Sequence, residues 1–141
     1  MRILVSACLL GCNCRYDGSH RACEAVAELR ETHQLIPVCP EQLGGLATPR
    51  LPSEIVADRV LARDGSDVSA AFQKGAHETL KLARLLGCET AILKSGSPSC
   101  GYGEIYDGTF TGGKRPGKGV TAALLEHAGL RVLTEDQLDE L

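Results

Sequence analysis

The sequence of 141 residues contains no tryptophan, one methionine and few aromatic side chains, which make up 4% of the chain. Such a composition leaves few flat side chains on which nucleic-acid bases could stack. The formal net charge of −3 gives no general attraction to nucleic acid or to an anionic membrane. No segment approaches the ~20 consecutive apolar residues of a membrane-spanning helix. We therefore expect no stable DNA binding and no membrane association.

The seven cysteines include no Cys-x-x-Cys pair, which is the usual spacing in structural zinc sites. The segment Met1–Ala7 is too short for the apolar core of a signal peptide, so we expect a cytoplasmic protein. Thiols stay reduced in that compartment. Cysteines that cluster there indicate metal binding or catalysis rather than disulfides.

The apolar segments predict one α/β domain over residues 1–141. Nearly continuous apolar runs indicate buried strands of a parallel sheet, and apolar residues three or four positions apart indicate helices. Strands that alternate with helices predict a Rossmann-like three-layer sandwich with a small, mainly parallel sheet of about four strands. The predicted strands are 2–7, 35–38, 90–94 and 130–133, the predicted helices are 22–32, 68–86 and 120–128, and Glu54 to Ala62 is a predicted strand or hairpin arm.

Three cysteines follow predicted strands directly or lie in the loop after one, namely Cys8, Cys39 and Cys100. Loops after the carboxyl ends of parallel strands gather on one edge of the sheet, where ligands bind. Three thiolates around one point indicate a metal centre with a free coordination position, of the zinc or the iron–sulfur type. Glu41 follows Cys39 by two residues, and a carboxylate near a metal can move protons.

The other cysteines are weaker candidates for a metal site. Cys23 and Cys88 lie within or beside helical patterns, and we expect them to be small apolar side chains of the core. Cys12 is either an ordinary loop residue or an accessory thiol. Together with Cys8 and Cys14 it forms a Cys-x3-Cys-x-Cys pattern that matches no usual ferredoxin spacing, so spacing alone identifies no metal.

The segment Gly112–Gly119 is rich in glycine and basic residues, and we expect it to be a loop. It nearly matches a P-loop, but Gly119 stands where the magnesium-binding Ser or Thr belongs, so a nucleoside triphosphatase is not favoured. Two interpretations stay open. The segment is a solvated loop, or it is a flexible lid whose basic side chains contact a phosphate of a substrate: Lys114, Arg115 and Lys118.

Several short motifs of this chain occur together in one known family. They are Ser6–Gly11, Cys14–Gly18, Val38–Glu41, Pro49–Arg50, Ser97–Gly101 and Gly117–Val120. In this combination the chain resembles a small bacterial family, long described as a domain of unknown function, some of whose members are thiouracil or thiouridine desulfidases. The resemblance extends over nearly the whole chain.

The resemblance implies a non-redox enzyme that hydrolyses the carbon–sulfur bond of a thiolated pyrimidine and releases hydrosulfide. Its substrate would be a free base or a nucleoside, and the acidic balance of the chain does not favour tRNA. The resemblance also implies an oxygen-sensitive [4Fe-4S] cluster held by three cysteines, with a Glu and a Ser near the open iron.

Residue by residue, the resemblance implies roles for four side chains of this sequence. Cys8 and Cys100 carry over as cluster ligands. The family pattern places the third ligand a few residues beyond the Glu, where this chain has Gly44 and Gly45. We predict that Cys39 substitutes for it, because Cys39 ends a strand, with Cys14 as the alternative. The proton-handling pair carries over to Glu41 and Ser97.

Other functions remain compatible with the same residues. A zinc-binding or other metal-binding module would use the same thiols without desulfidase activity. A cysteine-dependent enzyme would need no metal, and Cys100 is its candidate nucleophile if the pKa of its thiol is lowered. A regulator that binds phosphate or a nucleotide would use the basic segment.

Overall fold

The computed structural model describes residues 1–141. Its helices and strands are β1 (Arg2–Ser6), 3₁₀-helix η1 (Ala7–Leu10), α1 (Glu24–Glu28), 3₁₀-helix η2 (Leu29–Glu31), β2 (Gln34–Val38), α2 (Pro40–Leu43), β3 (Ser53–Val56), β4 (Arg59–Ala62), α3 (Ser69–Leu85), β5 (Thr90–Leu93), β6 (Tyr102–Tyr106), β7 (Lys114–Lys118), α4 (Val120–His127), β8 (Arg131–Thr134) and 3₁₀-helix η3 (Leu138–Glu140). None of the helices combines the length and the hydropathy needed to cross a bilayer.

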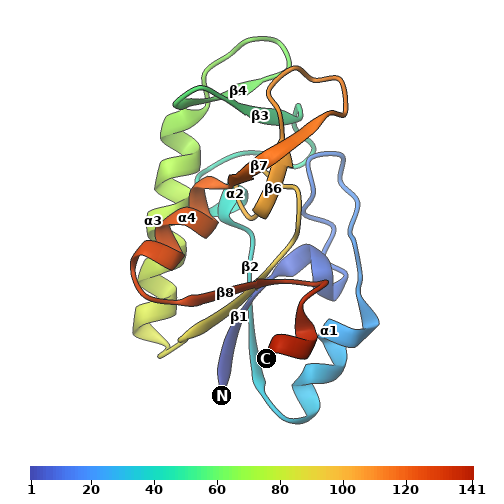
Figure 1. Cartoon of the computed structure of the whole chain (residues 1–141), viewed down its shortest axis with the longest axis vertical. Helices are drawn as coiled ribbons and strands as arrows, with labels where there is room; N and C mark the ends of the chain where they lie inside the picture. Colours follow the sequence, from blue (N-terminus) through green and yellow to red (C-terminus); the bar gives the residue numbers. More distant parts are fainter.

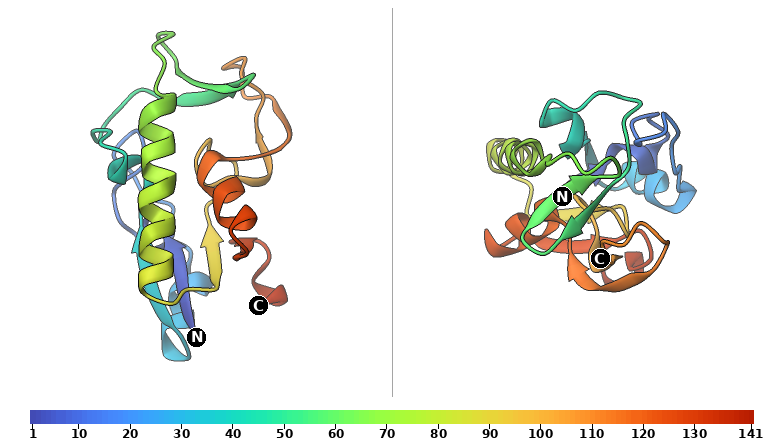
Figure 2. Two further views of the ribbon diagram at one scale, coloured as in Figure 1. Left: turned by 90° about the vertical axis from the view of Figure 1, so that its left-hand side faces the viewer. Right: turned by 90° about the horizontal axis from the view of Figure 1, so that it is seen from above.

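Four parallel strands form the central sheet in the order β2-β1-β5-β8. The long helix α3 and the shorter α4 lie on one side of this sheet, and α1 and the carboxyl terminus lie on the other (Figure 1). The view from the side shows α3 running nearly parallel to the strands (Figure 2). This arrangement confirms the predicted Rossmann-like three-layer sandwich with a small parallel sheet.

Successive side chains of β1 face opposite sides of the sheet and contribute to both core layers. Leu4 belongs to the core layer that faces α3 and α4, whereas Ile3 and Val5 belong to the layer that contains Val26 of α1. All four side chains are fully buried. Because both faces of the sheet are covered, its strands have continuous apolar sequences, as parallel strands usually do.

The register of the strands brings their carboxyl ends to the same level. Ser6 at the end of β1 pairs with Val38 at the end of β2, and Leu93 of β5 pairs with Thr134 of β8. The loops that follow therefore begin side by side on one edge of the sheet, although they are far apart in the sequence. In this order of strands, that edge is the usual place for a ligand.

Two glycines allow helix α2 to lie directly against α3. A Cβ atom on Gly44 would collide with the carbonyl oxygen of Ala71, and a Cβ atom on Gly75 would collide with the carbonyl oxygen of Pro40. Only glycine permits so close an approach of two backbones. The contact fixes α2, and with it Glu41 in the first turn, at the upper edge of the sheet.

The prediction of a loop at Gly112–Gly119 is wrong, because Lys114–Lys118 forms strand β7 and pairs antiparallel with β6. The sequence Lys-Arg-Pro-Gly-Lys lacks the β-branched and aromatic residues that usually indicate a strand. β7 pairs only with β6, and an edge strand tolerates a residue such as Pro116 that has no N–H group. The pairing with β6 therefore decides the local structure.

The predicted strand or hairpin arm between Glu54 and Ala62 is a complete hairpin, formed by β3 and β4. It lies above the carboxyl ends of the sheet, at the top of Figure 1. The carboxylate of Glu54 is buried and accepts hydrogen bonds from the N–H groups of Gly108 and Phe110. The hairpin and the turn between β6 and β7 are thereby joined above the sheet.

Candidate functional site

A cavity of about 450 Å³ lies between the carboxyl ends of the central sheet and the β3–β4 hairpin. Its floor includes residues close to the ends of strands, among them Cys8 two residues after β1, Cys39 directly after β2 and Lys94 directly after β5. Its upper wall includes Leu51 and Phe110. The position agrees with the general rule that open parallel sheets bind ligands at this edge.

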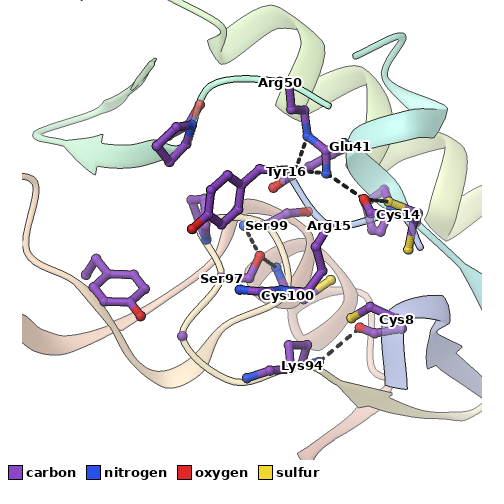
Figure 3. A pocket seen from close by; sticks show the side chains of 18 of the residues that line it. Cys8, Cys14, Arg15, Tyr16, Glu41, Arg50, Lys94, Ser97, Ser99 and Cys100 are labelled. Atoms are coloured by element: carbon purple, nitrogen blue, oxygen red, sulfur yellow. Dashed lines mark hydrogen bonds and ion pairs between the residues drawn. The ribbon is translucent and has the colours of Figure 1, made fainter. Parts of the chain in front are cut away.

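Four thiols line the cavity, and they come from four separate segments: Cys8, Cys14, Cys39 and Cys100. Cys39 is half-buried and the other three are buried. Figure 3 shows the labelled side chains of Cys8, Cys14 and Cys100 around the same space. The structure therefore brings Cys8, Cys39 and Cys100 to one cavity at this edge of the sheet, as predicted.

Burial dominates the electrostatics of these thiols. It raises the pKa of the Cys8 thiol, and the Lys94 ammonium opposes part of that rise. Burial raises the pKa of Cys14 to about 12, and nearby Cys39 and Cys8 add to the rise. Burial likewise raises the pKa of Cys100 far above its usual range. Thiolates crowded into such a cavity become favourable only when a cation binds them, since a thiolate is the form that ligates metal.

The raised pKa of Cys100 also bears on the metal-free alternative. A cysteine nucleophile needs a lowered pKa, because the thiolate is the reactive form. A buried thiol whose pKa is raised by burial is inert. The burial of this thiol therefore does not favour a metal-free cysteine enzyme built on Cys100.

The two candidates for the third ligand lie beside each other. Cys39 is the residue between β2 and α2, and Pro40 at the first helical position starts the helix directly after it. The Sγ atom of Cys39 donates a weak hydrogen bond of 3.7 Å to the backbone carbonyl of Cys14. Both thiols line the cavity, so the choice of Cys39 over Cys14 stays a prediction.

The three other cysteines do not line the cavity. Cys88 is buried in the core layer beside α3 and α4, and half-buried Cys23 packs against the opposite layer. These positions agree with the expectation that both are small apolar side chains. Cys12 is exposed.

Glu41 is the carboxylate closest in sequence to the thiols, and it extends from the first turn of α2. Its Oε2 atom accepts a hydrogen bond of 2.7 Å from Nε of Arg50 and lies 2.5 Å from Nη2 of the same guanidinium. Both side chains are largely buried (Figure 3). Arg50 belongs to the Pro49–Arg50 motif, but nothing in the neighbouring sequence indicates that its partner lies nine residues earlier.

Ser97 lies in the loop after β5, and its hydroxyl oxygen accepts two backbone hydrogen bonds. The N–H groups of Ser99 and Cys100 each donate to it over 3.0 Å. These bonds hold the turn that carries Cys100 and leave the hydroxyl proton of Ser97 available for donation. Ser97 lines the cavity together with Glu41.

Lys94 and Glu135 form an ion pair at the edge of the cavity that the sequence did not indicate. The ammonium lies 3.1 Å from the carboxylate, and both side chains are largely buried. Glu135 also accepts hydrogen bonds from the N–H and hydroxyl groups of Ser95, at 2.8 and 3.1 Å. Lys94 follows β5 and Glu135 follows β8, and the pairing of these two strands brings the residues together. The ion pair therefore depends on the order of strands in the sheet, which the sequence does not give.

The basic residues predicted to contact a substrate, Lys114, Arg115 and Lys118, lie on β7 and not in the wall of the cavity. The Lys118 ammonium pairs with Glu126 of α4. The Lys114 ammonium lies over the ring of Tyr106, which itself lines the cavity, at 5.5 Å. The segment is a paired strand and not a loop, and the contact of its basic side chains with a substrate stays a prediction.

Comparison with known proteins identifies the family of this chain. A family model described as 2-thiouracil desulfurase matches residues 3–137. The uncharacterized protein YbbK of Bacillus subtilis (strain 168) is 44% identical over 149 residues, which cover 99% of this chain and 99% of YbbK. The solved structure of TudS, a [4Fe-4S]-dependent thiouracil desulfidase, is similar with a TM-score of 0.94 and 45% identity, covering 99% of this chain and 94% of TudS. The likeness includes every segment that lines the cavity.

Proposed function

Because the chain belongs to the 2-thiouracil desulfurase family, we propose that it is a [4Fe-4S]-dependent enzyme that hydrolyses the carbon–sulfur bond of a thiolated pyrimidine. The observation that carries the proposal is the meeting of four thiols, Glu41 and Ser97 in one cavity. The likeness to TudS over 99% of the chain supports the choice of an iron–sulfur cluster.

The thiols of the cavity fit such a cluster. Soft thiolates are the usual ligands of iron–sulfur clusters, and we assign Cys8, Cys39 and Cys100, with Cys14 as the alternative to Cys39. A [4Fe-4S] cluster with three protein ligands supplies one Lewis-acidic iron with affinity for sulfur.

The residues around the cluster site supply proton transfer. Glu41 accepts a proton from the water that attacks the ring carbon bearing the sulfur. The carbon–sulfur bond breaks as a carbon–oxygen bond forms, the sulfur leaves as hydrosulfide, and no electrons are gained or lost. Ser97 orients the substrate or relays a proton through its hydroxyl group. General acid–base steps of this kind usually contribute about 10²–10⁴ to the rate.

The substrate is a free thiolated base or a nucleoside. Lys114, Arg115 and Lys118 lie outside the cavity wall, so they would contact only a part of a substrate that projects from the cavity. We propose that the reaction takes place in the cytoplasm, where a reducing environment keeps clustered thiols available as ligands.

Turnover of 2-thiouracil by protein purified without oxygen tests this function. We expect uracil and hydrosulfide in equal amounts, because hydrolysis releases one of each, and we expect loss of activity on exposure to air. A zinc-loaded preparation made from the apoprotein is the matched control and should be inactive. Activity that is equal in the zinc-loaded protein, or consumption of thiouracil without hydrosulfide, would rule out the proposed chemistry.

A further inference from the structure

Arg50 reaches three separate segments of the site through its guanidinium. A guanidinium has five N–H donors, and four of them donate hydrogen bonds here. Its side chain is only 10% exposed. The contacts are Nε and Nη2 with Oε2 of Glu41 at 2.7 and 2.5 Å, Nη2 with the carbonyl of Cys14 at 2.9 Å, and Nη1 with the carbonyl of Ala47 at 3.1 Å and the hydroxyl of Thr48 at 2.8 Å.

The two contacts with Glu41 go to the same carboxylate oxygen. Arg50 therefore holds Oε2 and leaves Oε1 without a hydrogen-bond donor from the protein. No buried side-chain oxygen of the chain lacks a partner, so Oε1 is open to solvent. Since Glu41 lines the cavity, this free oxygen is the one available to a water molecule there.

The same guanidinium also holds the loop that carries Cys14 and Tyr16. Beyond the bond from Nη2 to the Cys14 carbonyl, the backbone N–H of Arg50 donates to the carbonyl of Tyr16 over 2.7 Å. Arg50 thereby keeps the carboxylate of Glu41 at a fixed position relative to the loop that carries Cys14. A lysine in its place would have a single ammonium and could not reach all of these acceptors at once.

We propose that Arg50 is a positioning residue for the reaction, which holds Oε2 of Glu41 so that Oε1 faces the attacking water. This inference rests on the proposed function, because it assumes that Glu41 takes the proton of water. A displacement of about 1 Å in a reacting group can cost about 10²-fold in rate, so loss of the guanidinium should affect kcat strongly.

The test compares Arg50→Ala and Arg50→Lys with the wild-type protein, all loaded with the cluster under anaerobic conditions. We expect kcat for 2-thiouracil to fall about 10²-fold in both variants, with a much smaller change in KM. Iron content, sulfide content and the visible spectrum should stay those of the wild type. Methylguanidinium at millimolar concentration should raise kcat of Arg50→Ala, because it can occupy the vacated position, and should not raise kcat of Glu41→Gln.

Arg59→Lys is the matched control, because Arg59 also pairs with a carboxylate, that of Asp67, but at an exposed site away from the cavity. It should leave kcat unchanged. Near-normal kcat in Arg50→Lys would overturn the inference. So would a loss of kcat that is proportional to a loss of iron. A folded, cluster-loaded Arg50→Ala whose kcat methylguanidinium does not raise would overturn it as well. If Arg50→Ala does not fold, the change in kcat and KM of Arg50→Lys decides. A wild-type protein without turnover would refute the proposed function itself, whereas active Arg50 variants would refute only the role of Arg50.

Discussion

The Cys100→Ser variant is expected to lose its iron and its activity together while keeping its fold. Cys100 is buried in the loop after β5 and lines the same cavity as Cys8 and Cys39. A serine hydroxyl is a hard, weakly acidic donor and a poor ligand for an iron–sulfur cluster, so we expect less than about a tenth of the wild-type iron. Iron and sulfide analysis after anaerobic reconstitution, with circular dichroism to check the fold, measures the effect.

Cys88→Ser is the control for this prediction, because Cys88 is an equally buried thiol that lies in the core and away from the cavity. Burying a hydroxyl there should lower the free energy of unfolding by about 1–3 kcal/mol without changing the iron content. If both variants keep full iron, Cys100 is not a ligand. If both lose it equally, the loss comes from destabilisation.

The Glu41→Gln variant is expected to keep its cluster and lose nearly all turnover. Glutamine has the same shape and still presents one oxygen to Arg50, so the ion pair becomes a hydrogen bond and the site keeps its geometry. The amide cannot accept the proton of water, and the loss should be about 10²–10⁴ in kcat. Steady-state rates together with the visible spectrum of the anaerobic protein test this.

Glu54→Gln provides a matched comparison, since Glu54 also lines the cavity but its carboxylate accepts the backbone N–H groups of Gly108 and Phe110. An amide oxygen can accept the same bonds, so turnover should change only a few-fold, within the ~1 kcal/mol that one such hydrogen bond usually contributes. Equal losses in the two variants would show that Glu41 is not the base.

Sequence periodicity predicts the central sheet of this protein because its strands are buried on both faces and therefore have continuous apolar sequences. The long helix α3 is equally clear from its apolar stripe, and its observed bounds, Ser69–Leu85, lie within the predicted 68–86. The β6–β7 hairpin is not predictable in this way. Its second strand contains lysine, arginine, proline and glycine, and only pairing with β6 makes it extended.

In the site, too, residues at strand ends are predictable from the sequence, whereas pairs that form between distant segments are not. The thiols of Cys8 and Cys39 are predictable because they follow strands whose ends must share one edge of the sheet. Arg50 and the Lys94–Glu135 pair are not, because their partners are set by how α2 and β8 pack and by no pattern in the neighbouring sequence. Side chains that position others are therefore found only with the structure.

Mössbauer spectroscopy of the anaerobic protein loaded with ⁵⁷Fe shows whether thiols from separate strand ends hold one cluster with an open iron. We expect the spectrum of a [4Fe-4S] cluster in which one iron differs from the other three and alone changes when 2-thiouracil is added. An active protein whose iron atoms are all equivalent and unaffected by 2-thiouracil, or one that contains no iron, would refute the assignment of such a cluster to these thiols.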